Sequence, residues 1–167
     1  MMKNILMVSC FAFSIVSCSL PLGNNQSKWE YEKSAIDLNI KSDPRLNLLQ
    51  EKAHSLILCI YHLRDLNGFN QLIDEKDGLP KLLECGRFDS GVTYAKRIVV
   101  QPDRETKESM DRTEGAKYVG IVAGYYDLQK NNSVRSFQIP LSFFQNPKRL
   151  SICLDLGPQG IKEIKEK

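Results

Sequence analysis

Residues 118–127 read YVGIVAGYYD and carry the strongest strand signal in the chain. The segment is rich in β-branched and aromatic residues, which fit the pleated surface of a sheet. Gly120 and Gly124 have the spacing of a helix-pairing motif, but within a strand they indicate relief of crowding or a bulge. The segment therefore predicts that the fold contains a β-sheet.

Other segments also have strand patterns. Residues 56–63 (LILCIYHL) are apolar on both faces, as expected of a central strand, and residues 36–40 alternate apolar and polar side chains. Further strands are predicted at residues 92–101, 106–110, 136–140 and 150–156, with a hairpin turn at residues 131–132. Six or seven short strands favour a mainly β fold, a two-sheet β-sandwich, over a parallel α/β fold.

A short helical insertion is predicted between two of these strands. Phe69, Leu72 and Ile73 recur at helical spacing, and a second short helix is expected from Pro80 to the stop at Gly86. We place the insertion at about residues 68–86. The sandwich domain is expected to cover residues 29–160, and residues 161–167 are expected to form a charged C-terminal tail.

The composition is that of one globular domain. The chain has 167 residues, 42% of them hydrophobic and 26% charged, with a formal net charge of +3. These values exclude a wholly disordered chain and a multi-span membrane protein. Lysine and arginine are dispersed along the chain, so we do not expect a nucleic-acid partner.

Residues 1–17 predict a lipoprotein signal peptide. Lys3 precedes an uncharged apolar run over residues 5–16, which is too short to span a bilayer and has the length of a signal-peptide core. The run ends in IVSC at residues 15–18, which resembles a bacterial lipobox, so Cys18 is predicted to be the lipidated mature N-terminus. Ser19, in place of Asp, predicts sorting to the outer membrane, and residues 18–28 are expected to form a flexible tether.

No catalytic or metal-binding motif is found in the sequence. His54 and His62 belong to no zinc or nucleophile motif. Cys59 and His62 have an odd spacing within a predicted strand, which places them on opposite faces. We therefore expect neither an enzyme nor a metal site, and no cofactor beyond the covalent lipid on Cys18.

Three cysteines remain if Cys10 is removed with the signal peptide and Cys18 is acylated. They are Cys59, Cys85 and Cys153. In an oxidising compartment they allow one disulfide and one free thiol, in three pairings among which the sequence does not choose.

Taken in order, several motifs resemble the TssJ/SciN lipoprotein family of bacterial type VI secretion. They are the lipobox with Cys18, DLN at residues 37–39, IYHLRD at residues 60–65, Phe69 with the helical segment after it, and YVGIVAGYYD at residues 118–127. The last of these is the most specific. The sequence departs from the family pattern at His62, where Gln is usual, and at Tyr126, where Arg is frequent.

The resemblance implies a transthyretin-like sandwich of two sheets, tethered to the periplasmic face of the outer membrane. It also implies binding to the periplasmic C-terminal region of the inner-membrane protein TssM, in a complex of TssJ, TssM and TssL. The family contacts TssM through the loop between the first two strands, here about residues 41–53. The expected contact residues are Asp43, Arg45, Leu46, Asn47, Leu48, Leu49 and Gln50.

Apolar side chains within a polar rim suit such a contact, but the leucines of this loop have an alternative role. The loop can instead fold back on the sandwich and bury them. Two other functions also stay open from the sequence: a pilotin or structural adaptor of another envelope machine, and a periplasmic hydrolase, which requires a convergent polar site that the sequence does not show.

Overall fold

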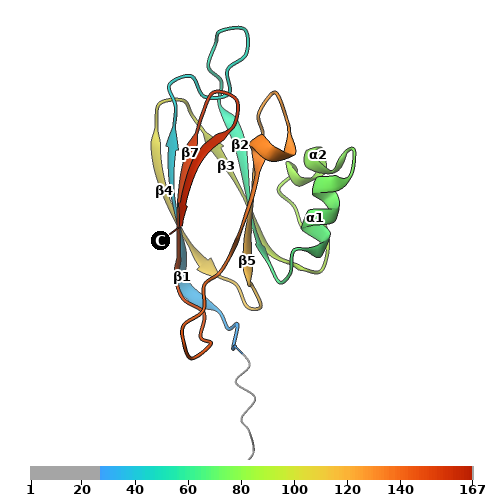
Figure 1. Ribbon diagram of the computed structural model, residues 1–167, viewed down its shortest axis with the longest axis vertical. Coiled ribbons are helices and arrows are strands. Elements are labelled where there is room, and N and C mark those ends of the chain that lie inside the picture. Colours follow the sequence, from blue (N-terminus) through green and yellow to red (C-terminus); the bar gives the residue numbers. More distant parts are fainter. Residues whose placement is uncertain (1–26, 167) are drawn as a thin grey trace, which may run out of the picture.

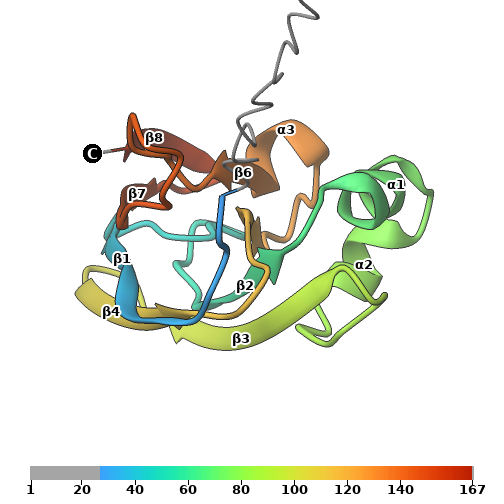
Figure 2. The same ribbon diagram turned by 90° about the horizontal axis from the view of Figure 1, so that it is seen from below.

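The computed structural model describes residues 27–166, which form a sandwich of two four-stranded sheets (Figures 1 and 2). The first sheet has the order β4-β1-β7-β8 and contains β1 (Glu32–Ser42), β4 (Glu105–Arg112), β7 (Leu150–Leu156) and β8 (Ile161–Glu166). The second has the order β3-β2-β5-β6 and contains β2 (Leu56–Leu63), β3 (Val92–Val100), β5 (Tyr118–Ala123) and β6 (Val134–Gln138). The predicted signal peptide, Cys18 and Ser19 lie outside the described residues.

All neighbouring strands are antiparallel except β1 and β7, which run parallel. The main core lies between the two sheets, where alternate residues of β1, such as Ile36 and Leu38, face Leu58 and Ile60 of β2. The two-sheet sandwich predicted from the strand patterns is confirmed. No helix within residues 27–166 is long and apolar enough to cross a membrane.

Two short helices cover the outer face of the second sheet (Figure 2). They are α1 (Asn67–Asp74), which begins one residue before the predicted insertion of about residues 68–86, and α2 (Gly78–Leu82), which lies within it. Phe69 and Leu82 form a second apolar cluster with Tyr61, from the face of β2 opposite the main core. This explains why β2 is apolar on both faces, as expected of a central strand. Gly120 of β5 leaves the space for Phe69, because a Cβ atom there would lie 2.8 Å from the ring.

A disulfide joins Cys59 of β2 to Cys85, just after α2, and closes a loop with a sequence separation of 26. This is one of the three pairings that the sequence left open. Cys153 of β7 is the free cysteine within the described residues and is half-buried. The disulfide fixes the helical insertion to the sheet that it covers.

Two expectations about the chain after β5 are wrong. Residues 161–166 are not a tail: they form β8, which pairs antiparallel with β7, and Ile161 is buried. Its Lys and Glu residues, which suggested a tail, are typical of an edge strand that resists pairing with other chains. Residues 131–132 lie in a helical turn, α3 (Lys130–Ser133), rather than in a tight hairpin turn.

Candidate partner-binding surface

The loop of residues 43–55 joins β1 to β2 at one end of the sandwich, which we call the apical end. It lies at the top of Figure 1, while β1 begins at the bottom. Two backbone hydrogen bonds hold it against the end of β7 and the turn that follows: Asp43 N–H donates to the Leu156 carbonyl at 2.9 Å, and Leu48 N–H to the Pro158 carbonyl at 2.8 Å. The loop is therefore a fixed part of the sandwich.

Asp43 stabilises the base of this loop. One carboxylate oxygen accepts a hydrogen bond of 2.8 Å from the Arg45 backbone N–H, and the other is paired with the ammonium group of Lys162 on β8. The hydrogen bond from Lys162, together with that from Arg45, lowers the pKa of Asp43. Asp43 thus has partners inside the protein, whereas the Arg45 side chain is 70% exposed.

The three leucines of the loop have different environments. Leu46 has no exposed surface and belongs to the core between the sheets, so the expectation that it contacts a partner is wrong. For this residue the folded-back alternative is correct, because burial of a leucine side chain stabilises the fold by about 2 kcal/mol. Leu48 is half-buried, and Leu49 is 40% exposed.

Asn47 connects the loop to the segment after β5. Its side chain is buried, donates a hydrogen bond of 3.2 Å to the Ser55 carbonyl, and accepts one of 2.9 Å from the Tyr126 backbone N–H. The backbone of Asn47 is left-handed, with φ of 48°, a conformation that asparagine tolerates better than most residues. Asn47 is therefore a positioning residue and has almost no surface to offer a partner.

A hollow of about 360 Å³ lies where these segments meet, and its lining includes Leu48, Leu49, Tyr126 and Gln159. Tyr126 is 57% exposed and has the ring of His54 edge-on at 5.2 Å. We call the exposed residues Arg45, Leu49, Gln50 and Tyr126 the apical surface. Tyr126 was not among the expected contact residues, because its position beside this loop depends on the tertiary hydrogen bond to Asn47.

Except for His54 beside Tyr126, the described histidines and cysteines lie away from the loop of residues 43–55 or are buried in the fold. No group of three or more His, Cys, Asp or Glu within the described residues could hold a metal ion. His62 is buried beneath Tyr94, at 4.8 Å between ring centroids, and burial lowers its pKa to about 4. Cys59 is in the disulfide and therefore provides no thiolate.

Comparison with known proteins identifies the family of this fold. Residues 34–155 match the T6SS-SciN family model, described as type VI secretion lipoprotein, VasD, EvfM, TssJ. No curated protein matches the chain.

Three solved structures illustrate the similarity of fold. The T6SS lipoprotein TssJ1 from Pseudomonas aeruginosa is 19% identical with a TM-score of 0.62, over 83% of this chain and 96% of that one. Serratia marcescens Lip, a membrane-bound component of the type VI secretion system, is 17% identical with a TM-score of 0.62, over 78% and 96%. A chain of the structure described as T6SS protein TssM C-terminal domain (869-1107) from EAEC is 16% identical with a TM-score of 0.59, over 76% and 94%.

The family match covers most of the described sandwich, from residue 34 in β1 to residue 155 in β7. The family supplies a structural component of a secretion machine and not an enzyme. The chain belongs to the TssJ/SciN family of type VI secretion lipoproteins, which are part of the membrane complex of that system.

Proposed function

We propose that a lipid on Cys18 anchors this protein to the periplasmic face of the outer membrane. We further propose that its apical surface binds the periplasmic C-terminal region of TssM, within the complex of TssJ, TssM and TssL. The observation that carries the second proposal is the exposure of Leu49 and Tyr126 on neighbouring loops of one rigid end of the sandwich.

The chemistry of the apical surface supports a protein partner. Its exposed residues are a tyrosine and a leucine together with the polar Arg45 and Gln50, and apolar anchors combined with polar residues are common in protein interfaces. The loop is held by Asn47 and by the buried side chain of Leu46. A surface that is already ordered binds with a smaller entropic cost than a loop that orders on binding.

The position of the surface supports the anchoring proposal. The chain enters the sandwich just before β1, which begins at the end opposite the loop of residues 43–55 (Figure 1). Trp29 is held there by its carbonyl, which accepts a hydrogen bond of 2.7 Å from Gly115 N–H, and by the guanidinium of Arg112, 5.9 Å from its ring. A tether attached at this point leaves the apical surface free to face the periplasm.

The partner proposal is tested by co-purifying residues 19–167 with the periplasmic part of the TssM that is encoded with this protein. Leu49→Asp places a charge in the contact and is expected to weaken capture at least tenfold, about 1.4 kcal/mol. Phe143→Asp is the matched control, since it changes another exposed apolar residue at the opposite end. No capture by the unsubstituted chain would refute TssM as the partner, and equal capture by the Leu49 variant would refute the surface.

The anchoring proposal is tested separately, in cells. Cys18→Ser is expected to move the protein from the membrane fraction to the soluble periplasm and to abolish type VI secretion. Ser19→Asp is expected to keep the lipidated protein at the inner membrane. Full secretion by the soluble Cys18 variant would show that the anchor has no mechanical role.

A further inference from the structure

The loop of residues 139–149 joins β6 to β7 at the end of the sandwich opposite the apical surface, which we call the basal end (Figure 1). It carries Phe143 and Phe144, which are 93% and 76% exposed. No other large hydrophobic side chain of the described chain is as exposed as these two. Exposure of two adjacent phenylalanine side chains to water is unfavourable in free energy. Such a patch indicates a surface that a membrane or another molecule covers.

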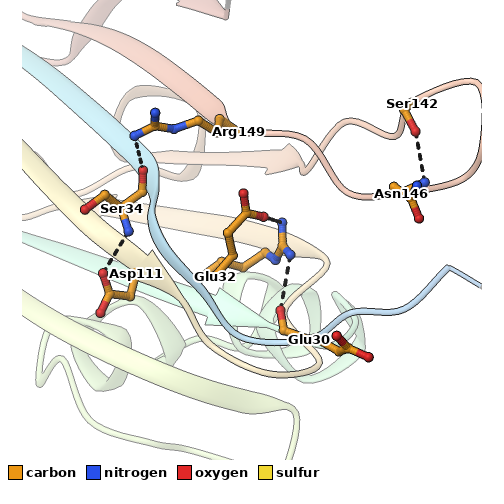
Figure 3. A network of polar contacts seen from close by, with 8 residues as sticks. Glu30, Glu32, Ser34, Asp111, Ser142, Asn146 and Arg149 are labelled. Atoms are coloured by element: carbon orange, nitrogen blue, oxygen red, sulfur yellow. Dashed lines mark hydrogen bonds and ion pairs between the residues drawn. The ribbon is translucent and has the colours of Figure 1, made fainter.

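The loop holds both rings outward. Backbone pairing of Leu141 with Pro147 closes it, and Ser142 N–H donates to the Asn146 carbonyl at 2.8 Å. The hydroxyl of Ser142 accepts a further bond of 3.0 Å from Asn146 N–H (Figure 3). The two phenylalanines are thus at the tip of a closed hairpin, with their rings edge-on at 5.5 Å, and they have no core beneath them to enter.

The basal loop is tied to the place where the chain enters the sandwich. Figure 3 shows the guanidinium of Arg149 donating to the backbone carbonyl of Ser34 on β1. At the start of the loop, Ile139 N–H donates to the Lys117 carbonyl at 2.8 Å, in the segment whose Gly115 binds Trp29. Residues 19–28 separate Trp29 from Cys18 and span about 35 Å when extended. A membrane that holds Cys18 is therefore within reach of the basal loop.

The charge of the loop suits a phospholipid surface. Residues 139–149 contain Lys148 and Arg149 and no Asp or Glu. Lys148 is exposed, and Arg149 remains 63% exposed while it lies 3.9 Å from Asp37. Exposed aromatic side chains beside basic residues are typical of segments that lie in the interface of a bilayer containing anionic lipid.

We propose that Phe143 and Phe144 insert into the phospholipid surface next to the lipid anchor. With the anchor, they give the protein two points of attachment, which holds the sandwich upright with its apical surface away from the bilayer. This inference rests on the proposed anchoring through Cys18. A second copy of this chain is the competing occupant of the same surface.

The test uses the lipidated mature chain in vesicles of phosphatidylethanolamine and phosphatidylglycerol. Phe144→Trp places an indole at the tip of the loop, and Tyr126→Trp is the matched control at the apical end. Trp29 is common to all chains, so its emission is subtracted with the unsubstituted protein. We expect brominated lipid to quench most of the emission of the indole introduced at position 144 and to leave the emission of the indole at position 126 unchanged. When Phe143→Ser is added, the emission of the indole at position 144 should be quenched less.

Flotation of the vesicles separates failure of the inference from failure of the anchor. A chain that does not float with the vesicles overturns the anchor and the insertion together. A chain that floats while the indole at position 144 stays unquenched overturns the insertion alone. Residues 19–167 retain every residue of both apolar clusters. The oligomeric state of this soluble chain tests the competing occupant. If the chain is a dimer, and the double variant Phe143→Ser, Phe144→Ser is a monomer, a second copy covers the loop and the lipid assignment is wrong.

Discussion

Asn47 and Tyr126 are joined by a hydrogen bond of 2.9 Å, from the backbone N–H of Tyr126 to the side-chain oxygen of Asn47. The bond links two loops that lie far apart in the sequence, with Leu49 and Tyr126 itself exposed on either side of it. One buried side chain therefore sets the relative position of the two apolar residues of the apical surface.

Asn47→Ala is expected to lower the free energy of unfolding by about 1–3 kcal/mol, because it leaves the N–H of Tyr126 without its partner. It is also expected to weaken TssM capture, although Asn47 itself is buried. Urea denaturation and co-purification measure the two effects. Gln50→Ala is the control for stability, since an exposed residue of the same loop should change it by less than about 0.5 kcal/mol. Unchanged stability of the Asn47 variant would contradict the linking role.

Leu46 and Leu49 are expected to separate folding from binding. Leu46→Ala removes a fully buried side chain and should cost about 2–5 kcal/mol of stability. Leu49→Ala should leave the melting temperature nearly unchanged and weaken TssM capture. Thermal unfolding combined with the capture assay reads out both. The assignment fails if Leu49→Ala destabilises the fold as much as Leu46→Ala.

Removal of the disulfide is expected to destabilise the sandwich. Cys85→Ser opens the loop between Cys59 and Cys85 and should cost about 2–4 kcal/mol, chiefly through the greater freedom of the unfolded chain. Cys153→Ser, at the half-buried free cysteine, should have a much smaller effect. Denaturation with and without a reducing agent measures the contribution of the disulfide to the free energy of unfolding. Because the Cys85 variant has no disulfide, the reducing agent should not change its stability further.

Gly120→Ala is expected to cost about 1–3 kcal/mol, because its methyl group would overlap the ring of Phe69. Gly86→Ala is the matched control, since no atom lies within 4 Å of a Cβ there. Denaturant unfolding of both variants measures the difference. Adding Phe69→Leu should recover part of the loss in the Gly120 variant, and a purely additive double variant would argue against the overlap.

Protonation of His62 is expected to weaken the fold in acid. Its pKa is lowered by burial to about 4 in the folded chain, against a usual value near 6.5. As the pH falls from 6.5 toward 4, the unfolded chain binds a proton that the folded chain excludes, so stability falls, by up to about 3 kcal/mol. His62→Gln removes this titration and should flatten the stability profile between these pH values. Parallel profiles for the two proteins would contradict the assignment.

Most of the strand pattern could be predicted because the apolar alternation of β1 and β7 and the two-sided β2 are local properties of the sequence. β8 could not be predicted, because an edge strand rich in Lys and Glu has the same composition as a solvated tail. Only its pairing with β7, which is a tertiary contact, distinguishes the two. The pairing of Cys59 with Cys85 likewise depends on the insertion folding over β2.

The contact residues stay a prediction, and the structure decides only which of them are exposed. A loop between the first two strands was expected at about residues 41–53 and is found at residues 43–55, where Leu49 is exposed. Leu46 and Leu49 are alike in sequence, and which one enters the core depends on the path of the loop backbone, which is left-handed at Asn47, Gln50 and Glu51. Tyr126 joins the surface from another segment through a tertiary hydrogen bond, which no local pattern contains.

The apical loop and the point where the chain enters the sandwich are the two ends of one strand, β1, which lies between β4 and β7 in its sheet. If a membrane anchor and a partner pull on these ends, the tension runs along β1. Because β1 is already an extended strand, its covalent backbone carries this tension directly, and the hydrogen bonds to β4 and β7 on its two sides keep it in place in the sheet. The second sheet shares the load through Tyr126, which follows β5 and is joined to the loop after β1 by its hydrogen bond to Asn47.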